Sequence, residues 1–178
     1  MRLRVGLVVT VVTMVLVGAL GACTPAGPGA GPWAATVCGA LATWRTSITD
    51  LNQRAAVEMT GSTTPDQTRA NLLDLVAGAR EATETARVAV AAAGVPPVAG
   101  GEQVAHGFTE SLARTRDAYA GAEAELRAMS TQDESAFYDG VVEVLGQLTA
   151  EYDEAGQALA TLNSPELREA FDNTAECR

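Results

Sequence analysis

The sequence predicts an all-α protein, an antiparallel up-down four-helix bundle followed by a short fifth helix at the C-terminus. Alanine is abundant, aromatic residues make up only 4% of the chain, and the alternation typical of strands is missing after the N-terminal segment. Four segments carry apolar residues at spacings of three and four, the period of one helix face. Short polar or Pro/Gly stretches separate them, as the loops of an antiparallel bundle require.

The first 23 residues carry an export pattern. Arg2 and Arg4 form a basic start, residues 5–17 are apolar, and Leu20-Gly21-Ala22-Cys23 follows. This arrangement resembles the signal peptide and lipobox of bacterial lipoproteins, whose motif is Leu, two small residues and Cys. The resemblance implies cleavage before Cys23, a diacylglyceryl lipid on its sulfur, and a lipid-anchored position on the extracytoplasmic side of the cell membrane.

Two alternatives to a lipidated Cys23 remain open. The apolar run is near the lower limit for spanning a bilayer, so it could stay in place as a transmembrane helix. The product could also be secreted without lipid. The cysteine count favours lipidation, because three Cys leave an odd thiol unless one is alkylated. With Cys23 modified, Cys38 and Cys177 remain as one pair in an oxidising compartment.

The exported chain is expected to be strongly acidic. All twelve basic residues are Arg, and removal of Arg2 and Arg4 leaves ten Arg against 22 Asp and Glu, a side-chain charge of −12 with His106 neutral. This charge argues against nucleic acid as a partner and against electrostatic binding to anionic lipid headgroups. We therefore expect the lipid to hold the protein to the membrane, which two acyl chains can do without a basic patch.

Residues 24–32 contain three Pro and three Gly, a composition that favours a tether with no helix and no buried side chain. The sequence therefore divides into three parts. These are a signal peptide over residues 1–22, a lipidated Cys with its tether over residues 23–32, and a helical domain over residues 33–178.

The first helix is predicted over about Trp33 to Met59. Its apolar face recurs at helical spacing through Val37, Leu41, Trp44, Ile48, Leu51, Ala55 and Met59.

The second helix is predicted to start after Thr64, an N-cap with Pro65 in the first turn and Gln67 closing a capping box. It extends to about Ala93, where Gly94 and two prolines stop it. The second half of its apolar face is small enough to let a neighbouring helix approach closely. The face consists of Leu72, Val76, Ala79, Thr83, Ala86, Val90 and Ala93.

The third helix begins near Gly101 and carries the cleanest repeat, through Ala105, Phe108, Leu112, Thr115, Tyr119, Ala122, Leu126 and Met129. Thr131 and Glu134 then predict a capping box at the start of the fourth helix. The apolar face of that helix consists of Tyr138, Val141, Leu145, Leu148, Tyr152, Ala155, Leu159 and Leu162. Pro165 opens a fifth helix to about Glu176, whose apolar face is Leu167, Ala170 and Phe171. A long parallel coiled coil is the competing fold, but the breaks after each helix argue against it.

The order of the helices predicts a disulfide. Alternating directions return the end of the fourth helix to the level where the first begins. The fifth helix, about 18 Å long at 1.5 Å per residue, can cross the base of the bundle but cannot climb it. This route brings Cys177 beside Cys38. The alternative is a pair of free buried thiols.

No catalytic or metal site can be recognised in the sequence. His106 is the only histidine and has only Glu110 one turn away, so we expect a surface residue rather than a metal ligand. Glu151, Asp153 and Glu154 flank the inward-facing Tyr152, which predicts a solvated acidic face rather than a cation site. Motifs for a nucleophilic Ser, a phosphate loop or a Cys-x-x-Cys are missing. We therefore expect no enzyme activity, no cofactor and no metal.

Trp33 and Trp44 are expected to anchor the core or a loop rather than to stack on a sugar. Five glycines fall inside predicted helices, each at a cost of about 0.5 to 1 kcal/mol relative to Ala. Close helix crossing, neutral drift and a ligand groove all remain open as explanations. These glycines are Gly107, Gly121, Gly140, Gly146 and Gly156.

Two functions from different classes fit the sequence. The first is a protein interaction module that is displayed outside the membrane and recognises an envelope component or another protein. The second is a carrier or sensor of a small apolar molecule held between helices where Ala and Gly replace bulky side chains. The filled apolar faces favour the module. The lipobox, tether and Lys-free helical domain are together similar to uncharacterised small helical lipoproteins of actinobacteria, a likeness of composition that assigns no functional residue. The partner, the ligand and the oligomeric state are left open.

Overall fold

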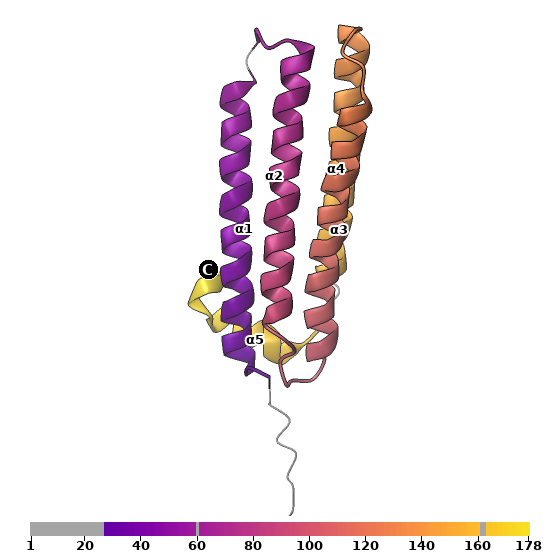
Figure 1. The fold of residues 1–178 in the computed structure, drawn as a ribbon. Coiled ribbons are helices and arrows are strands. Elements are labelled where there is room, and N and C mark those ends of the chain that lie inside the picture. The colour runs from indigo at the N-terminus through magenta and orange to yellow at the C-terminus, as the bar shows by residue number, and fades with distance from the viewer. Residues whose placement is uncertain (1–26, 60, 161–162) are drawn as a thin grey trace, which may run out of the picture.

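The computed structural model describes residues 27–59, 61–160 and 163–178. Four long helices dominate this part of the chain: α1 (Ala30–Glu58), α2 (Pro65–Ala92), α3 (Gly101–Ala128) and α4 (Glu134–Ala160). A short helix α5 (Pro165–Asn173) and a 3₁₀ turn η1 (Ala175–Cys177) follow. The long helices alternate in direction and each packs against the next in sequence (Figure 1). The predicted all-α bundle with a short fifth helix is confirmed.

The predicted signal peptide, the lipobox Cys23 and tether residues 24–26 lie outside the described residues, and so does Leu162 of the predicted fourth helix. In the part of the chain that is described, no helix combines the length and the apolarity that crossing a bilayer requires.

Helix α1 begins at Ala30, so the last three residues of the predicted tether are helical. The expectation that the whole Pro/Gly stretch stays out of a helix is wrong for residues 30–32. Pro32 lies in the first turn, where backbone N–H groups have no partner within the helix, so its missing N–H costs no hydrogen bond. The Trp33 N–H already donates to the Gly29 carbonyl, at 3.0 Å.

The start of α2 follows its sequence pattern. The Thr64 hydroxyl accepts a hydrogen bond from the Gln67 N–H at 3.3 Å, and the Gln67 side-chain oxygen accepts one from the Thr64 N–H at 3.0 Å. This is the predicted capping box. At the other end, Gly94 adopts a φ of +71°, which favours glycine, and it turns the chain away after the last turn of α2.

The start of α4 differs from the prediction, because Asp133 and not Thr131 caps the helix. The Asp133 carboxylate accepts the Ala136 N–H at 3.0 Å. The Thr131 hydroxyl instead donates to the Asp66 carboxylate in the first turn of α2, at 2.6 Å. A tertiary hydrogen bond thus engages the side chain that the local pattern assigns to the cap.

The core has two hydrophobic clusters, one at each end of the bundle. The cluster at the end where α1 begins is built around Trp33, Val37, Val90, Leu112 and Leu167. The cluster at the far end is built around Leu72, Val76, Leu126, Phe137 and Val144. The layer between them is made of small or polar buried residues: Ala79, Thr83, Ser111, Thr115 and Ala118.

The buried face of α4 matches the predicted one in part, since Val141 and Ala155 are buried as expected. Phe137 and Val144 are buried, whereas Leu145 and Tyr152 of the predicted face are 36% and 43% exposed. The reason is the position of α4, which packs against α3 and α2 but meets α1 through stacked rings. Trp44 and Tyr152 bridge that side with ring centroids 6.2 Å apart, so the α1–α4 side is the more open one.

Helix α5 crosses the end of the bundle where α1 begins (Figure 1). Leu167 is buried there, and the Phe171 ring packs 5.9 Å from the ring of Trp33. Trp33 is fully buried and its indole N–H donates to the Gly94 carbonyl at 2.8 Å. This confirms Trp33 as a core anchor. Helix α5 ends at Asn173, earlier than predicted, and η1 follows it.

Candidate binding groove

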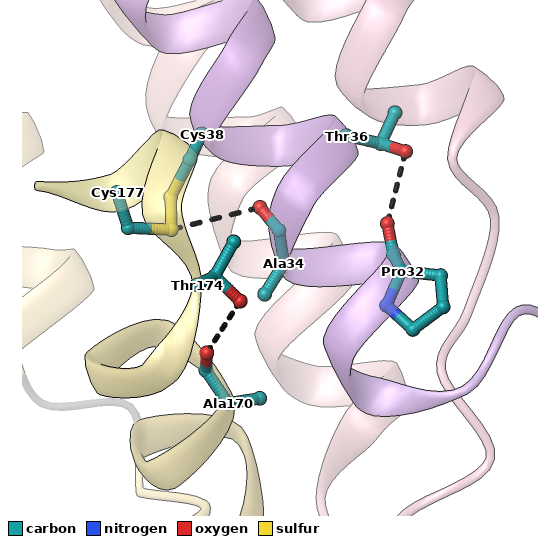
Figure 2. Close-up of a disulfide and its surroundings, with 7 residues drawn as sticks. All are labelled: Pro32, Ala34, Thr36, Cys38, Ala170, Thr174 and Cys177. Atoms are coloured by element: carbon teal, nitrogen blue, oxygen red, sulfur yellow. Dashed lines mark hydrogen bonds between the residues drawn. A yellow bond between two sulfur atoms is a disulfide. The ribbon is translucent and has the colours of Figure 1, made fainter.

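Cys38 and Cys177 form a disulfide, as the sequence and helix order predict (Figure 2). Their Cα atoms lie 5.0 Å apart across 139 positions of sequence. The Cys177 sulfur also lies 3.8 Å from the Ala34 carbonyl oxygen, one turn before Cys38 on α1. The bond therefore fixes the C-terminal turn to the first part of α1.

The side chains that could bind a metal, according to the sequence, lie at the surface. His106 is exposed, with its Nδ1 3.4 Å from the Glu110 carboxylate. Glu151, Asp153 and Glu154 are exposed as expected, although Tyr152 beside them is only partly covered. Within the described ranges, no three His, Cys, Asp or Glu side chains gather in a group that could hold a metal ion.

A groove of about 980 Å³ lies between α1 and α2. Its floor consists of apolar residues that are buried or half-buried: Trp44, Leu51, Gly78, Ala82, Ala86 and Ala89. Exposed charged residues stand along its rim: Asp50, Arg54, Glu58 and Glu81. An apolar floor below a polar edge is the usual make-up of a binding site.

Small residues of α2 create the depth of this groove. Gly78, Ala82 and Ala89 project little from the helix, so the space beside them stays open. At Gly78 the backbone comes so close to α1 that an added Cβ would lie 2.6 Å from a methyl carbon of Leu51. A larger residue there would displace Leu51 from the floor.

Among the described residues that line the groove, Trp44 is the one aromatic residue, and contacts on two sides hold its ring in place. Its indole N–H donates to the Thr83 hydroxyl at 3.0 Å, and Thr83 in turn donates to the Ala79 carbonyl at 2.7 Å. Its ring stacks on Tyr152 of α4. Trp44 is therefore a half-buried anchor between three helices, in line with the expectation from sequence.

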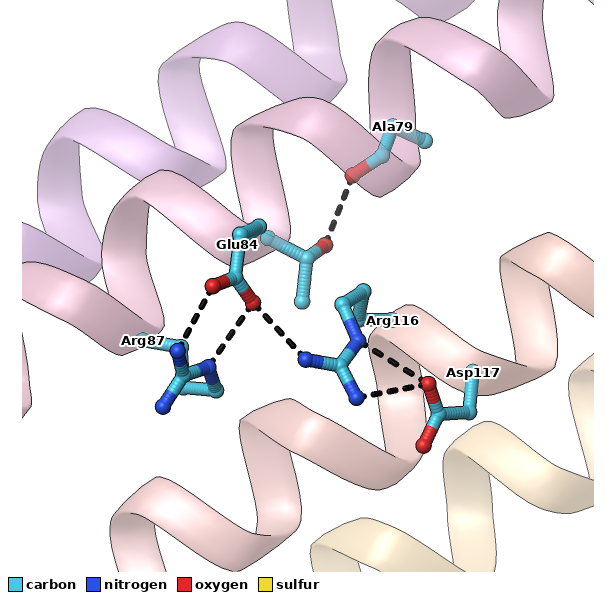
Figure 3. A network of polar contacts seen from close by, with 6 residues as sticks. Ala79, Glu84, Arg87, Arg116 and Asp117 are labelled. Atoms are coloured by element: carbon cyan, nitrogen blue, oxygen red, sulfur yellow. Dashed lines mark hydrogen bonds and ion pairs between the residues drawn. The ribbon is translucent and has the colours of Figure 1, made fainter.

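The charges on the groove rim differ from those elsewhere on α2. Among the residues that the structure describes, none of Asp50, Arg54, Glu58 and Glu81 has an ion-pair partner within 4.0 Å. On the α3 side of α2, by contrast, Glu84 accepts hydrogen bonds from Arg87 at 2.6 and 2.7 Å (Figure 3). The rim carboxylates are thus available to an outside group.

Glu84 also joins α2 to α3. Its carboxylate accepts a bond from Arg116 at 3.0 Å, and Arg116 binds the neighbouring Asp117 at 2.7 Å (Figure 3). Hydrogen bonds from Arg87 and then from Arg116 lower the pKa of Glu84 from 4.5 to about 2. This network holds two helices together on the side of α2 that does not face the groove.

Sequence reasoning did not identify this groove. The apolar face assigned to α2 runs through Ala79, Thr83 and Ala86 and packs into the bundle, and of these three only Ala86 also lines the groove. The neighbouring row of Gly78, Ala82, Thr85 and Ala89 has the same spacing and lines the groove. A second row of small residues beside the core row was the available signal.

The chain was compared with protein families, curated proteins and solved structures, and none of them matches it.

Proposed function

We propose that this protein is a lipid-anchored extracytoplasmic lipoprotein whose helical domain acts as a non-enzymatic interaction module. The lipobox resemblance around Cys23 supports the anchor. The Cys38–Cys177 disulfide supports export, since such bonds persist in oxidising compartments. It also accounts for two of the three cysteines and leaves Cys23 for the lipid.

The observation that best supports a role as an interaction module is the α1–α2 groove. Its apolar floor offers area whose burial stabilises a complex, and its unpaired rim charges offer orientation and specificity. The disulfide and α5 brace the first part of α1, near the predicted anchor. The groove begins at Ala40, just beyond this braced part, and would extend from there away from the membrane.

Crosslinking and pull-down of the membrane-anchored protein from its own envelope test this function. Ala82→Trp fills the middle of the groove, and Ala91→Trp puts the same bulk on an exposed part of α2 outside it. We expect a protein partner with the unmodified chain and with Ala91→Trp, and loss of that partner with Ala82→Trp. Equal recovery with both variants would show that the groove is not the recognition surface.

A carrier or sensor of a small apolar molecule is the second candidate, favoured by the size of the groove and its Ala and Gly floor. Its weakness is that the groove is open along one side. Each buried methylene is worth about 0.8 kcal/mol, and an acyl chain lying in an open groove keeps part of its length in water. Such a chain is more stable in the adjacent bilayer. A stoichiometric apolar molecule in solvent extracts of the purified protein would favour the carrier.

The anchor has its own test. Mass spectrometry of the membrane-extracted protein is expected to show Cys23 as the N-terminus with a diacylglyceryl group attached. A full-length chain with an unmodified Cys23 would exclude lipidation and point to the retained transmembrane helix.

A further inference from the structure

The residues that line the groove are spaced like two faces of a helical bundle. On α1 the lining residues Ala40, Trp44, Ser47, Leu51, Arg54 and Glu58 alternate spacings of four and three. On α2 the row of Gly78, Ala82, Thr85 and Ala89 does the same. Two such rows side by side are the surface against which a third helix packs.

The length and the floor of the groove also suit a helix. The lining from Ala40 to Glu58 covers about 27 Å at 1.5 Å per residue, which matches five turns of a helix. Small residues on α2 allow another backbone to approach closely. Because one side of the groove is open to solvent, the bound element must present a polar outer face and an apolar inner one.

The charges on the groove rim indicate the sign of the charge that the partner carries. Asp50, Glu58 and Glu81 stand against a single cation, Arg54, and no described ion pair engages any of the four. Basic side chains flanking the apolar stripe of a bound helix would reach these carboxylates. The same charges disfavour a second copy of this acidic chain as the occupant.

From spacing, length, openness and charge we propose that the groove binds one amphipathic α-helix of a partner protein, apolar on its inner face and basic along both flanks. This proposal rests on the proposed interaction module and adds the chemistry of its partner.

Synthetic helical peptides of 18 residues test the proposal by titration against the membrane-anchored protein in neutral phosphatidylcholine vesicles, with empty vesicles as the blank. One peptide carries a Leu stripe with Lys on both flanks, and a second has Glu in place of Lys. A third is the Lys peptide with a central Pro, which breaks the helix. We expect the Lys peptide to bind at least about tenfold more tightly than either control at low salt, and this advantage over the Glu peptide to shrink as salt screens the rim.

Matched variants connect the binding to the groove. We expect Ala82→Trp to abolish binding of the Lys peptide and Ala91→Trp to leave it unchanged, and Thr85→Trp serves as a second groove-filling change if Ala82→Trp fails to fold. The triple change Asp50→Asn, Glu58→Gln and Glu81→Gln is expected to weaken binding about tenfold. A control triple on α4 removes the same charge away from the groove: Asp139→Asn, Glu143→Gln and Asp153→Asn. This control triple is expected to weaken binding of the Lys peptide by less than about twofold.

The proposal is overturned if the three peptides bind equally, or if both triple variants weaken binding to the same extent. It is also overturned if palmitate binds and the peptides do not, or if the groove is occupied by a second copy in a dimer that Ala82→Trp dissociates. If a groove-dependent partner is recovered from the envelope while the Lys peptide fails to bind, the proposed function stands and this inference falls.

Discussion

At the scale of single residues, Gly78 and Trp44 give the groove its shape. Gly78 lets Leu51 of α1 lie directly on the backbone of α2. Trp44 closes the wall because its indole N–H is bonded to Thr83 and its ring is stacked on Tyr152. One small and one large side chain therefore set the depth and the edge of the site. Neither role can be read from the periodicity of a single helix, since both depend on the neighbouring one.

The helical glycines singled out from the sequence separate into different cases. An added Cβ at Gly121, Gly146 or Gly156 would meet nothing within 4 Å, so close helix crossing does not explain these three. At Gly140 the added atom would lie 3.3 Å from the end of Met129. The glycine that lines the groove is Gly78, which the sequence pattern did not single out.

Gly121→Ala and Gly146→Ala are therefore expected to stabilise the domain by about 0.5 to 1 kcal/mol each, because alanine loses less backbone entropy in a helix. Urea unfolding of each variant beside the unmodified chain measures the change. A decrease in the free energy of unfolding at either position would mean that its Cβ meets a neighbour after all.

The Glu84 network predicts a pH dependence. Because the pKa of Glu84 is lowered to about 2 in the folded chain, its carboxylate stabilises the fold above its ordinary pKa of 4.5. That contribution is lost as the pH falls through about 2. Stability should decline across this range more steeply in the unmodified chain than in Glu84→Gln, which cannot titrate. A carboxyl titration by NMR that places Glu84 near 4.5 would contradict the network.

At the scale of the elements, sequence patterns predict most of each helix but not its cap or its buried face where tertiary contacts intervene. The capping box at Thr64 forms because its two partners are neighbours in the chain. The one expected at Thr131 does not, because Asp66 of another helix takes the Thr131 hydroxyl. The buried face of α4 likewise depends on how far α4 stands from α1, a distance that no local pattern contains.

The C-terminal elements depend on the disulfide. Helix α5 has only nine residues, too few to be stable alone, and it is held by Leu167, by Phe171 and by the bond from Cys177 to Cys38. Cys177→Ser, compared with Cys38→Ser and the double variant, is expected to lower the free energy of unfolding by about 2 to 5 kcal/mol.

In these cysteine variants, amide hydrogen exchange should rise first in α5 and η1, while the amides of α2 and α3 stay protected. Two reactive thiols in the denatured, unreduced protein, those of Cys38 and Cys177, would show that the bond is not formed.

At the scale of the whole molecule, the sequence predicts the all-α bundle and the meeting of Cys38 with Cys177, since both follow from helix count, direction and length. The groove could not be predicted in the same way. It arises from the gap that α1 and α2 leave when the small residues on a second face of α2 stand opposite the half-buried middle of α1. Sequence periodicity reports one buried face per helix, whereas the site uses the face beside it.

The central claim is that the α1–α2 groove is the surface through which the anchored protein meets its partner. Photo-crosslinking in the intact envelope tests it most directly, with a photoreactive residue in place of Ala82 inside the groove or of Ala91 outside it. We predict one discrete protein adduct from position 82 and none from position 91. The same adduct from both positions, or adducts from position 91 alone, would contradict the claim.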